Sequence, residues 1–362
     1  MVRKGLSLAE DEWVHRDALH EWWYVNSHLT DQVGRRFGAV ISFFPDYMLF
    51  GLADKQGRRM ARAEVLRGRR LASVRTGVKL NGNYFLGAGS PGSYSLRYTS
   101  ADVALDLSLE ATKDPMLVNG MGKIREGLLG DSWYYALTSV SASGRLLLDG
   151  EERKVSGVAW VDRQWGRWED MGIGGWEWFS LQFSNGCEVL ATQIYSPVTR
   201  RPCSKVMTLK RKDSSGFHSE NFSIRRVESW TSGSSGLAYG KRWTLVSPGV
   251  LDVAITVDFE EQEFHRGFWE GCCSFEGTLE GERVTGVGYS EQVDRSPGPL
   301  AEKLSLIAAP GHYVLQNLFG RANLGLWDLS ERLRLWRILT VRRRWDAWEK
   351  AHSVTGSRPP SP

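Results

Sequence analysis

Two stretches of the chain repeat one another, and this repetition constrains the fold more than any other feature of the sequence. The segment V-S-G-V-A-W-V-D (Val155–Asp162) aligns without a gap on V-T-G-V-G-Y-S-E (Val284–Glu291), so that a constant offset relates the two. A Trp-rich stretch, a turn glycine and an aromatic run before proline also occur twice, from Glu21 to Pro45 and from Trp176 to Pro197. Two matches in the same order predict two copies of one folding unit.

The segments within each copy have the pattern of β-strands. The runs at 35–44, 93–111, 188–195 and 251–259 alternate polar with apolar residues or are rich in β-branched and aromatic residues. Turn signals separate such runs, for example Asn-Gly-Asn at 81–83 and Ser-Asn-Gly at 184–186. This pattern predicts an all-β antiparallel fold, either a sandwich or a barrel.

The length of 362 residues suits two domains, and a Gly-rich stretch marks a boundary between them near Trp168–Gly175. After Arg295 the β pattern stops, and Leu and Trp side chains mark one face of a basic, amphipathic segment. The expected segments are a lead-in at 1–20, a first β-domain at 21–170, a second at 171–295, a helical extension at 296–351 and a disordered tail at 352–362.

Signatures of several kinds of chemistry are missing from the sequence. It has no P-loop, no dinucleotide glycine fingerprint, no His-Glu-x-x-His, no Cys-x-x-Cys and no Gly-x-Ser-x-Gly. The histidines are scattered, and although His15, His20 and His28 could cluster, we expect neither a metal site nor a cofactor. The β-rich region shows no basic patch interleaved with aromatic residues, so no nucleic-acid partner is expected.

The expected location is the cytoplasm. No run approaches the ~18 apolar residues that a membrane span needs. The N-terminus turns acidic before any apolar run develops, unlike a signal peptide. Cys272 and Cys273 are adjacent, which favours a reducing compartment over a disulfide framework.

Asp162 stands in the most Trp-rich stretch of the chain. Because successive side chains on a strand point to opposite faces, Trp160 and Asp162 share one face, as do Tyr289 and Glu291. A barrel turns one such face inward, and burial beside an indole would raise the pKa of the Asp162 carboxyl. A neutral carboxyl in an apolar pocket could donate a proton or a hydrogen bond.

An alternative interpretation gives Asp162 a structural role. It could pair with Arg163 or Arg167 at a strand end and only hold the domain interface. If instead Asp162 faces a cavity, Trp23, Tyr134 and Trp178 on the other Trp-rich strands are the expected wall residues.

Five stretches together resemble a known superfamily. They are HEWWYVNSHL, DSWYYALTSVSASGRL, VSGVAWVDRQWG, GGWEWFSLQFSNG and FWEGCCSFEGTLEGERVTGVGYSEQ, in this order along 20–292. The sequence is similar to the lipocalin-like superfamily of hydroxyneurosporene synthase (carotenoid 1,2-hydratase), AttH-type proteins and lipocalin-like Diels–Alderases. The resemblance implies two tandem calycin-like β-domains with a ligand pocket at or near their junction.

The resemblance also implies a role for Asp162, because the hydratases of this superfamily protonate an alkene with the acid of an aromatic-x-Asp motif. The matching motif here is Trp160-Val161-Asp162. These hydratases also use a histidine and a tryptophan on an earlier strand, and the corresponding stretch Ser132–Leu137 contains Trp133 but no histidine. This departure favours a role that needs only a shaped aromatic pocket with hydrogen-bond donors.

The first expectation is therefore a cofactor-independent cyclase or isomerase that closes a hydrophobic polyene or polyketide-type metabolite by [4+2] cyclisation. The alternatives are an acid-initiated hydratase of a carotenoid or terpenoid double bond, with Asp162 as the proton donor, and a non-catalytic carrier of an apolar ligand. The C-terminal helix could pack on the β-body or contact a membrane surface. The candidate catalytic residues are Asp162, Trp160 and Glu291, and the candidate substrate-binding residues are Trp23, Tyr24, Tyr134, Trp165, Trp178 and Tyr289.

Overall fold

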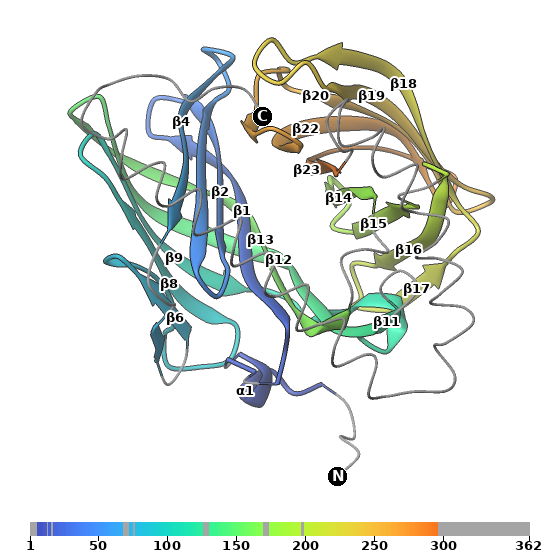
Figure 1. Ribbon diagram of the computed structural model, residues 1–362, viewed down its shortest axis with the longest axis horizontal. Coiled ribbons are helices and arrows are strands. Elements are labelled where there is room, and N and C mark those ends of the chain that lie inside the picture. The colour runs from blue at the N-terminus through green and yellow to red at the C-terminus, as the bar shows by residue number, and fades with distance from the viewer. Residues whose placement is uncertain are drawn as a thin grey trace, which may run out of the picture. The chain divides into compact units, whose positions relative to one another are not determined.

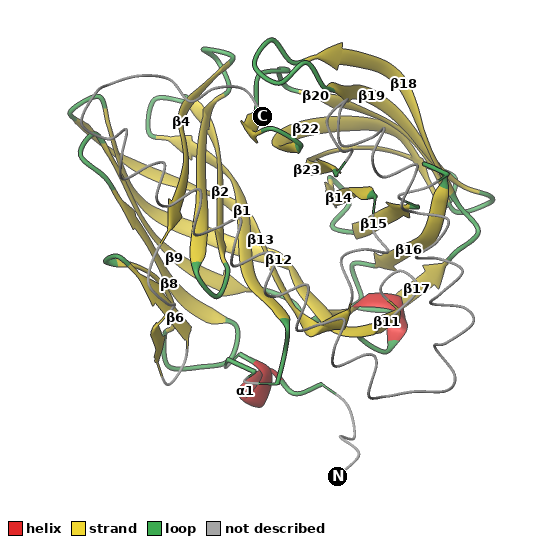
Figure 2. Cartoon of the chain, viewed as in Figure 1, coloured by secondary structure: helices red, strands yellow, loops and turns green. Residues whose placement is uncertain are grey.

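The computed structural model describes residues 6–12, 14–15, 17–67, 72–74, 77–125, 130–168, 174–196 and 199–295. The helical extension and the tail expected at 296–351 and 352–362 lie outside the described residues. The regular elements of the described part are strands, apart from the one-turn helix α1 (Leu8–Asp11) and the short 3-10 turn η1 (Val118–Gly120) (Figure 2). No helix in this part is long and apolar enough to span a membrane.

The strands form two antiparallel sheets, and each sheet curls into a half-barrel (Figure 1). The first sheet holds β1 (His20–Asp31), β2 (Arg36–Phe43), β3 (Tyr47–Asp54), β4 (Arg59–Arg67), β5 (Ala72–Val74), β6 (Gly77–Leu80), β7 (Asn83–Gly87), β8 (Ser93–Thr99), β9 (Val103–Ala111), β10 (Met116–Leu117), β11 (Lys123–Arg125), β12 (Gly130–Leu148) and β13 (Glu151–Trp168). The second sheet holds β14 (Gly175–Phe183), β15 (Glu188–Tyr195), β16 (Pro202–Lys210), β17 (Gly216–Ser219), β18 (Ser223–Thr231), β19 (Ala238–Ser247), β20 (Leu251–Val257), β21 (Glu263–His265), β22 (Phe268–Leu279) and β23 (Glu282–Asp294). The all-β antiparallel fold predicted from the sequence is confirmed.

Local sequence explains why these segments pair as they do. Along β9 the buried Val103, Leu105, Leu107 and Leu109 alternate with more exposed residues, so one face of the strand packs on a core. Asn81 and Gly82 join β6 to β7 with positive φ angles of 50° and 82°, a backbone form that tight hairpin turns need.

Each sheet has its own apolar core, and a third core lies between the sheets. The first core includes the stacked rings of Phe50 and Tyr98, and the second includes Trp243. The third cluster draws residues from both sheets, among them Trp160 from the first and Trp178 from the second. The two sheets therefore bury apolar faces against one another as well as within themselves.

The two sheets repeat one another strand by strand. The order β4-β3-β2-β1-β13-β12-β9-β8-β7 in the first corresponds to β17-β16-β15-β14-β23-β22-β20-β19-β18 in the second. In register, Tyr24 lies opposite Asp162 and Trp178 lies opposite Glu291. Asp162 and Glu291 therefore hold equivalent places on equivalent strands, as the constant offset between the two sequence copies predicts.

The segment before β1 is part of the first core. Leu6, Leu8, Val14 and Ala18 pack against it, and the side chain of Asp11 is fully buried. A hydrogen bond joins this segment to the first sheet, because the guanidinium of Arg163 donates to the carbonyl oxygen of Asp11 at 3.0 Å.

Candidate functional site

Asp162 lies on β13, in the apolar cluster between the two sheets, and its side chain is 2% exposed. Trp160 Nε1 donates a hydrogen bond to Asp162 Oδ1 at 2.6 Å, and the Tyr134 hydroxyl, from β12, donates to Asp162 Oδ2. Both carboxyl oxygens thus have neutral donors.

The second sheet completes this arrangement. Trp178, on β14, donates from its Nε1 to the Tyr134 hydroxyl oxygen at 2.9 Å. Its indole also meets the Trp160 ring edge-on, with ring centroids 6.3 Å apart. A carboxyl, a phenol and two indoles from both sheets therefore form one connected group.

Burial raises the pKa of Asp162 to about 7. The hydrogen bonds from Tyr134 and Trp160 favour the ionised form and oppose this shift, while the nearby Glu291 adds to it. Loss of solvation is the largest effect, because the carboxyl is removed from water and faces aromatic rings. Asp162 can therefore hold a proton close to neutral pH and release it.

A second pair of carboxyls belongs to the same region. Glu270 on β22 and Glu291 on β23 are direct neighbours in register. The Tyr24 hydroxyl donates to Glu270 Oε1 at 2.6 Å, and Trp176 Nε1 donates to Glu291 Oε1. Burial raises the pKa of both carboxyls, and for Glu270 the adjacent Glu291 raises it further.

Most of the residues predicted from the sequence meet in this region. The core cluster between the sheets contains Tyr24, Tyr134, Trp160, Trp178 and Tyr289. The Tyr289 hydroxyl donates to the Ser27 carbonyl oxygen at 3.3 Å. Asp162 and Glu291 lie among these aromatic residues, since each bonds to a tryptophan indole.

Trp23 and Trp165 are placed elsewhere, so the prediction that Trp23 lines a wall beside Asp162 is wrong. Both belong to the core of the first sheet, where the Arg163 guanidinium lies 3.9 Å from the Trp23 ring centre and 5.2 Å from that of Trp165. The reason is strand alternation. Trp165 and Arg163 are odd-numbered positions of β13, and Trp23 pairs with Arg163 in register, so all three face away from Asp162.

The alternative of an Asp162–arginine pair is also wrong. The Arg163 guanidinium forms a buried ion pair with Glu21 at 2.9 Å. Arg167 donates to the Asp17 carbonyl oxygen at 2.9 Å. The hydrogen-bond donors to Asp162 are instead the uncharged side chains of Tyr134 and Trp160.

Sequence reasoning missed Glu270 and Asn26. Asn26 Nδ2 donates to the Tyr24 hydroxyl oxygen at 3.1 Å and so supports the phenol that holds Glu270. A signal for Glu270 was present in the turn between β22 and β23, where Glu280 and Gly281 have positive φ angles of 51° and 86°. A two-residue turn of this kind fixes the register of the hairpin and places Glu270 opposite Glu291.

The three N-terminal histidines have separate partners. His15 contacts Asp11 and Glu21, the His20 ring lies against Trp168, and His28 Nδ1 lies 3.0 Å from Lys55 Nζ. Within the described ranges, no group of three His, Cys, Asp or Glu side chains is arranged to hold a metal ion.

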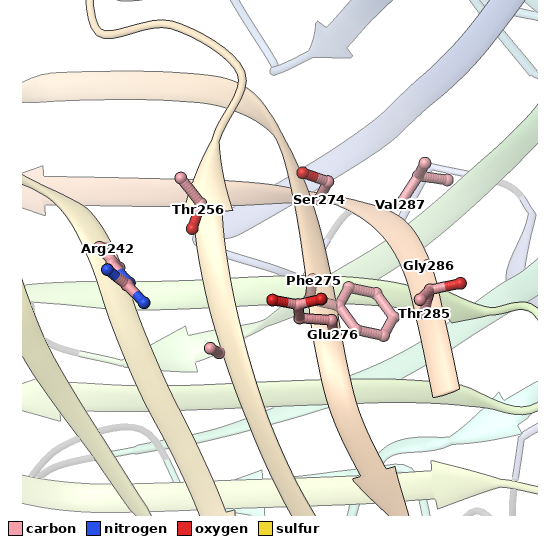
Figure 3. A pocket seen from close by; sticks show the side chains of 9 residues that line it. Arg242, Thr256, Ser274, Phe275, Glu276, Thr285, Gly286 and Val287 are labelled. Atoms are coloured by element: carbon pink, nitrogen blue, oxygen red, sulfur yellow. The ribbon is translucent and has the colours of Figure 1, made fainter. Parts of the chain in front are cut away.

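Two surface hollows occur in the second sheet. One, of about 420 Å³, is lined largely by exposed polar residues such as Arg242, Thr256 and Glu276 (Figure 3). The other, of about 210 Å³, includes Glu177 and Arg226. Neither hollow is lined by Asp162 or by the side chains that donate hydrogen bonds to it.

Two curled, antiparallel half-barrels with equivalent strand orders define a duplicated lipocalin-like protein. The model of the AttH-like family matches residues 50–293, which is more than half of the chain. The chain belongs to the AttH-like family. No curated protein matches it.

Solved structures share this fold. A crystal structure of an AttH protein from Nitrosomonas europaea is 25% identical, with a TM-score of 0.73, and the match covers 81% of this chain and 98% of that one. Kievitone hydratase from Nectria haematococca is 19% identical, with a TM-score of 0.68, over 81% of this chain and 96% of that one. The protein CghA is 11% identical, with a TM-score of 0.50, over 77% and 89% respectively. At such low identities, the last two show the fold alone.

Proposed function

We propose that the protein adds water to an isolated double bond of an apolar unsaturated compound, with Asp162 as the proton donor. The observation that carries this proposal is the Asp162 carboxyl itself, which is buried between two sheets, has no cationic hydrogen-bond partner among the described residues and has a pKa of about 7. General acid catalysis is most effective when the pKa of the acid lies near the working pH.

The Tyr134 hydroxyl can relay a proton from Asp162 to a substrate. In the ionised form of Asp162 the phenol donates to Oδ2 and accepts from Trp178. If Asp162 takes up a proton and donates it back to the phenol oxygen, that oxygen receives two donors, and its own O–H must turn elsewhere. A substrate next to Tyr134 would then receive a proton through the phenol, while Asp162 replaces the proton that the phenol gives up.

The surroundings suit a cationic intermediate. Trp160 and Trp178 present indole rings within one cluster, and the face of an indole attracts positive charge. The same rings exclude bulk water, so a carbocation formed here would meet only the water that the protein admits.

The name of one structural relative agrees with this proposal, because kievitone hydratase is named for a hydration. The resemblance to lipocalin-like Diels–Alderases keeps cyclisation as the rival outcome. Cyclisation requires mainly a shaped cavity. Neither hollow described above is lined by Asp162, Tyr134 or Trp178, whereas the protonatable acid lies within the aromatic cluster, so we place hydration ahead of the cyclisation expected from the sequence.

The test uses kievitone and neurosporene as probes, incubated with the full chain in ¹⁸O-labelled water and analysed by mass spectrometry. We expect a product heavier by one labelled water, and a loss of about 100-fold or more in its rate for Asp162→Asn. Asp252→Asn, at an exposed position of β20, is the matched control. A product of unchanged mass that forms equally well in Asp162→Asn would contradict the proposal and support an isomerase. Probe that is bound but recovered unchanged would support a carrier.

A further inference from the structure

We propose that Glu270 and Glu291 share one proton and that this pair accepts the proton released by water during the reaction. This inference rests on the function proposed above, since it assigns the second proton-transfer group of the same site. Glu270 is not among the candidate residues identified from the sequence.

The hydrogen bonds of the two carboxyls leave one buried oxygen of Glu270 without a donor among the described residues. Glu270 is 2% exposed, and its Oε1 accepts from the Tyr24 hydroxyl at 2.6 Å. Its Oε2 is buried and has no hydrogen-bond donor among the described residues. Glu291 lies directly opposite in register and is also removed from water. A buried carboxyl oxygen without a donor is costly if ionised, but as a protonated acid Glu270 can donate from Oε2 to Glu291.

The surroundings indicate which member of the pair carries the proton. Glu291 accepts from the Trp176 indole, and the positive charge of Arg295, whose guanidinium lies 5.0 Å from the centre of that indole, favours its ionised form. For Glu270 the neighbouring charges of Glu291 and Asp162 both favour the neutral form. The geometry thus gives a neutral Glu270 and an ionised Glu291, since two adjacent buried carboxyls do not both ionise.

The fold itself does not require a carboxyl at position 270. The strand pairing of the first sheet places Ala136 opposite Asp162, just as Glu270 lies opposite Glu291 in the second. The same folding unit therefore forms with a methyl group at this place. A glutamate there costs solvation free energy, and this cost without a structural need favours a chemical role.

A short series of contacts between aromatic side chains links the carboxyl pair to Asp162. The Tyr24 ring, which carries the hydroxyl bonded to Glu270, meets Trp178 edge-on with centroids 5.4 Å apart. Trp178 in turn donates to Tyr134, the partner of Asp162. A molecule that enters among these rings would have the acid on the first sheet and the carboxyl pair on the second.

The proposed hydration moves one proton from Asp162 to carbon and one proton from water to the carboxyl pair. The Asp162 O–H bond breaks, directly or through Tyr134, and a C–H bond forms at one carbon of the double bond. A water oxygen forms a C–O bond with the resulting cation, and one O–H bond of that water breaks, its proton passing to the Glu291 carboxylate. The pair then holds two protons and returns one to the Asp162 carboxylate. The net reaction is alkene plus water to alcohol, without a redox step.

Infrared spectroscopy tests the shared proton without any substrate. At about pH 9, roughly two units above the pKa of about 7 of Asp162, that residue is ionised, and the wild type should still show the carbonyl stretch of a buried protonated carboxyl. Asp162→Asn and the exposed control Glu276→Gln should keep this band, and Glu270→Gln should abolish it. Glu291→Gln should shift the band, because the acceptor changes from a carboxylate to an amide. The proposal is overturned if the wild type lacks the band, or if the band is unchanged in both Glu270→Gln and Glu291→Gln.

Rates with a probe that gains water separate this inference from the proposed function. We expect Glu270→Gln and Glu291→Gln to lower kcat by about 100-fold with little change in KM. If Glu270→Gln and Glu291→Gln are fully active while Asp162→Asn is inactive, the acceptor role is wrong and the proposed function stands. If instead Asp162→Asn is fully active, the proposed function is wrong, and the infrared result alone decides whether the proton is shared.

Discussion

Asn26 on β1 and Ser180 on β14 hold equivalent positions in the two repeats, and Asn26 Nδ2 donates a hydrogen bond to Ser180 Oγ at 3.0 Å. Their equivalence follows from register, since Asn26 lies opposite Trp160 and Ser180 lies opposite Tyr289. The two copies thus meet through the same strand of each unit, in the way that a symmetric dimer pairs like with like.

Replacement of Asn26 by alanine should weaken this contact. The change removes the donor to both Tyr24 and Ser180 in a buried setting, so we expect the free energy of unfolding to fall by about 2 kcal/mol. Urea unfolding measures the change. Asn221→Ala, at an exposed position, is the control and should stay within about 0.5 kcal/mol of wild type. Equal effects of the two substitutions would mean that the Asn26 contact contributes nothing.

Gly38 on β2 is a second point of close approach between the sheets. A Cβ there would lie 2.0 Å from Cys272 Sγ and 2.6 Å from the Tyr289 hydroxyl, both on the second sheet. Gly38→Ala should therefore destabilise the protein by about 1–3 kcal/mol, as measured by urea unfolding.

The matched control for Gly38→Ala is Gly233→Ala, because no atom lies within 4 Å of a Cβ at position 233. Adding Cys272→Ala to Gly38→Ala removes the nearest clashing atom, so the double variant should be more stable than the sum of the two single effects. Strict additivity would show that the two positions do not meet.

The sequence predicted the equivalence of strands correctly where the repeat supplied two examples of one pattern. The constant offset between the copies placed Trp160 and Tyr289, and Asp162 and Glu291, on equivalent strands, and the observed registers agree. Alternation along a single strand then predicted that Trp160 and Asp162 share a face, and their hydrogen bond agrees with this.

The sequence did not reveal which strands pair with one another or in which register. Trp23 was placed on the wrong face because its register opposite Arg163 depends on β1 meeting β13, a strand far away along the chain. The ion-pair partner of Arg163 could not be predicted for the same reason, because Glu21 lies on β1 and Arg163 lies on β13. Glu270 lies inside one of the stretches that carry the family resemblance, but its pairing with Glu291 and its bond to Tyr24 depend on strands that lie beside it only in the fold.

The buried ion pair inside the first sheet should contribute strongly to stability. Arg163→Met leaves the buried Glu21 carboxylate without its arginine partner, and we expect a loss of about 3 kcal/mol in the free energy of unfolding. Adding Glu21→Gln should recover part of this loss by removing the buried charge that has lost its arginine partner. Arg145→Met breaks an exposed pair with Glu152 and should cost less than about 1 kcal/mol. Similar losses for Arg163→Met and Arg145→Met would contradict this account.

Asp162 should also make stability depend on pH in a definite direction. Its pKa is about 7 in the folded protein against an ordinary value of 3.8, so between these values the folded state binds the proton that the unfolded state has lost. The contribution of Asp162 to the free energy of unfolding is therefore greatest below about pH 4. It falls by roughly 4 kcal/mol as the pH rises from about 4 to about 7.

Urea unfolding of Asp162→Asn at a series of pH values checks this dependence. Relative to wild type, the variant should gain stability across the interval from about pH 4 to about pH 7. Asp252→Asn controls for the loss of one negative charge at an exposed position. A difference between Asp162→Asn and wild type that does not vary with pH would show that the Asp162 carboxyl is ionised throughout.

A titration of the side-chain carboxyl carbon of Asp162 by NMR tests most directly whether this residue carries a proton near neutral pH. In protein labelled with ¹³C at aspartate carboxyls, the resonance absent from Asp162→Asn identifies the group. We predict a midpoint near the pKa of about 7, and a lower midpoint in Glu291→Gln, because the Glu291 charge helps to raise it. A midpoint at or below about 4, the range of an ordinary aspartate, would contradict the account.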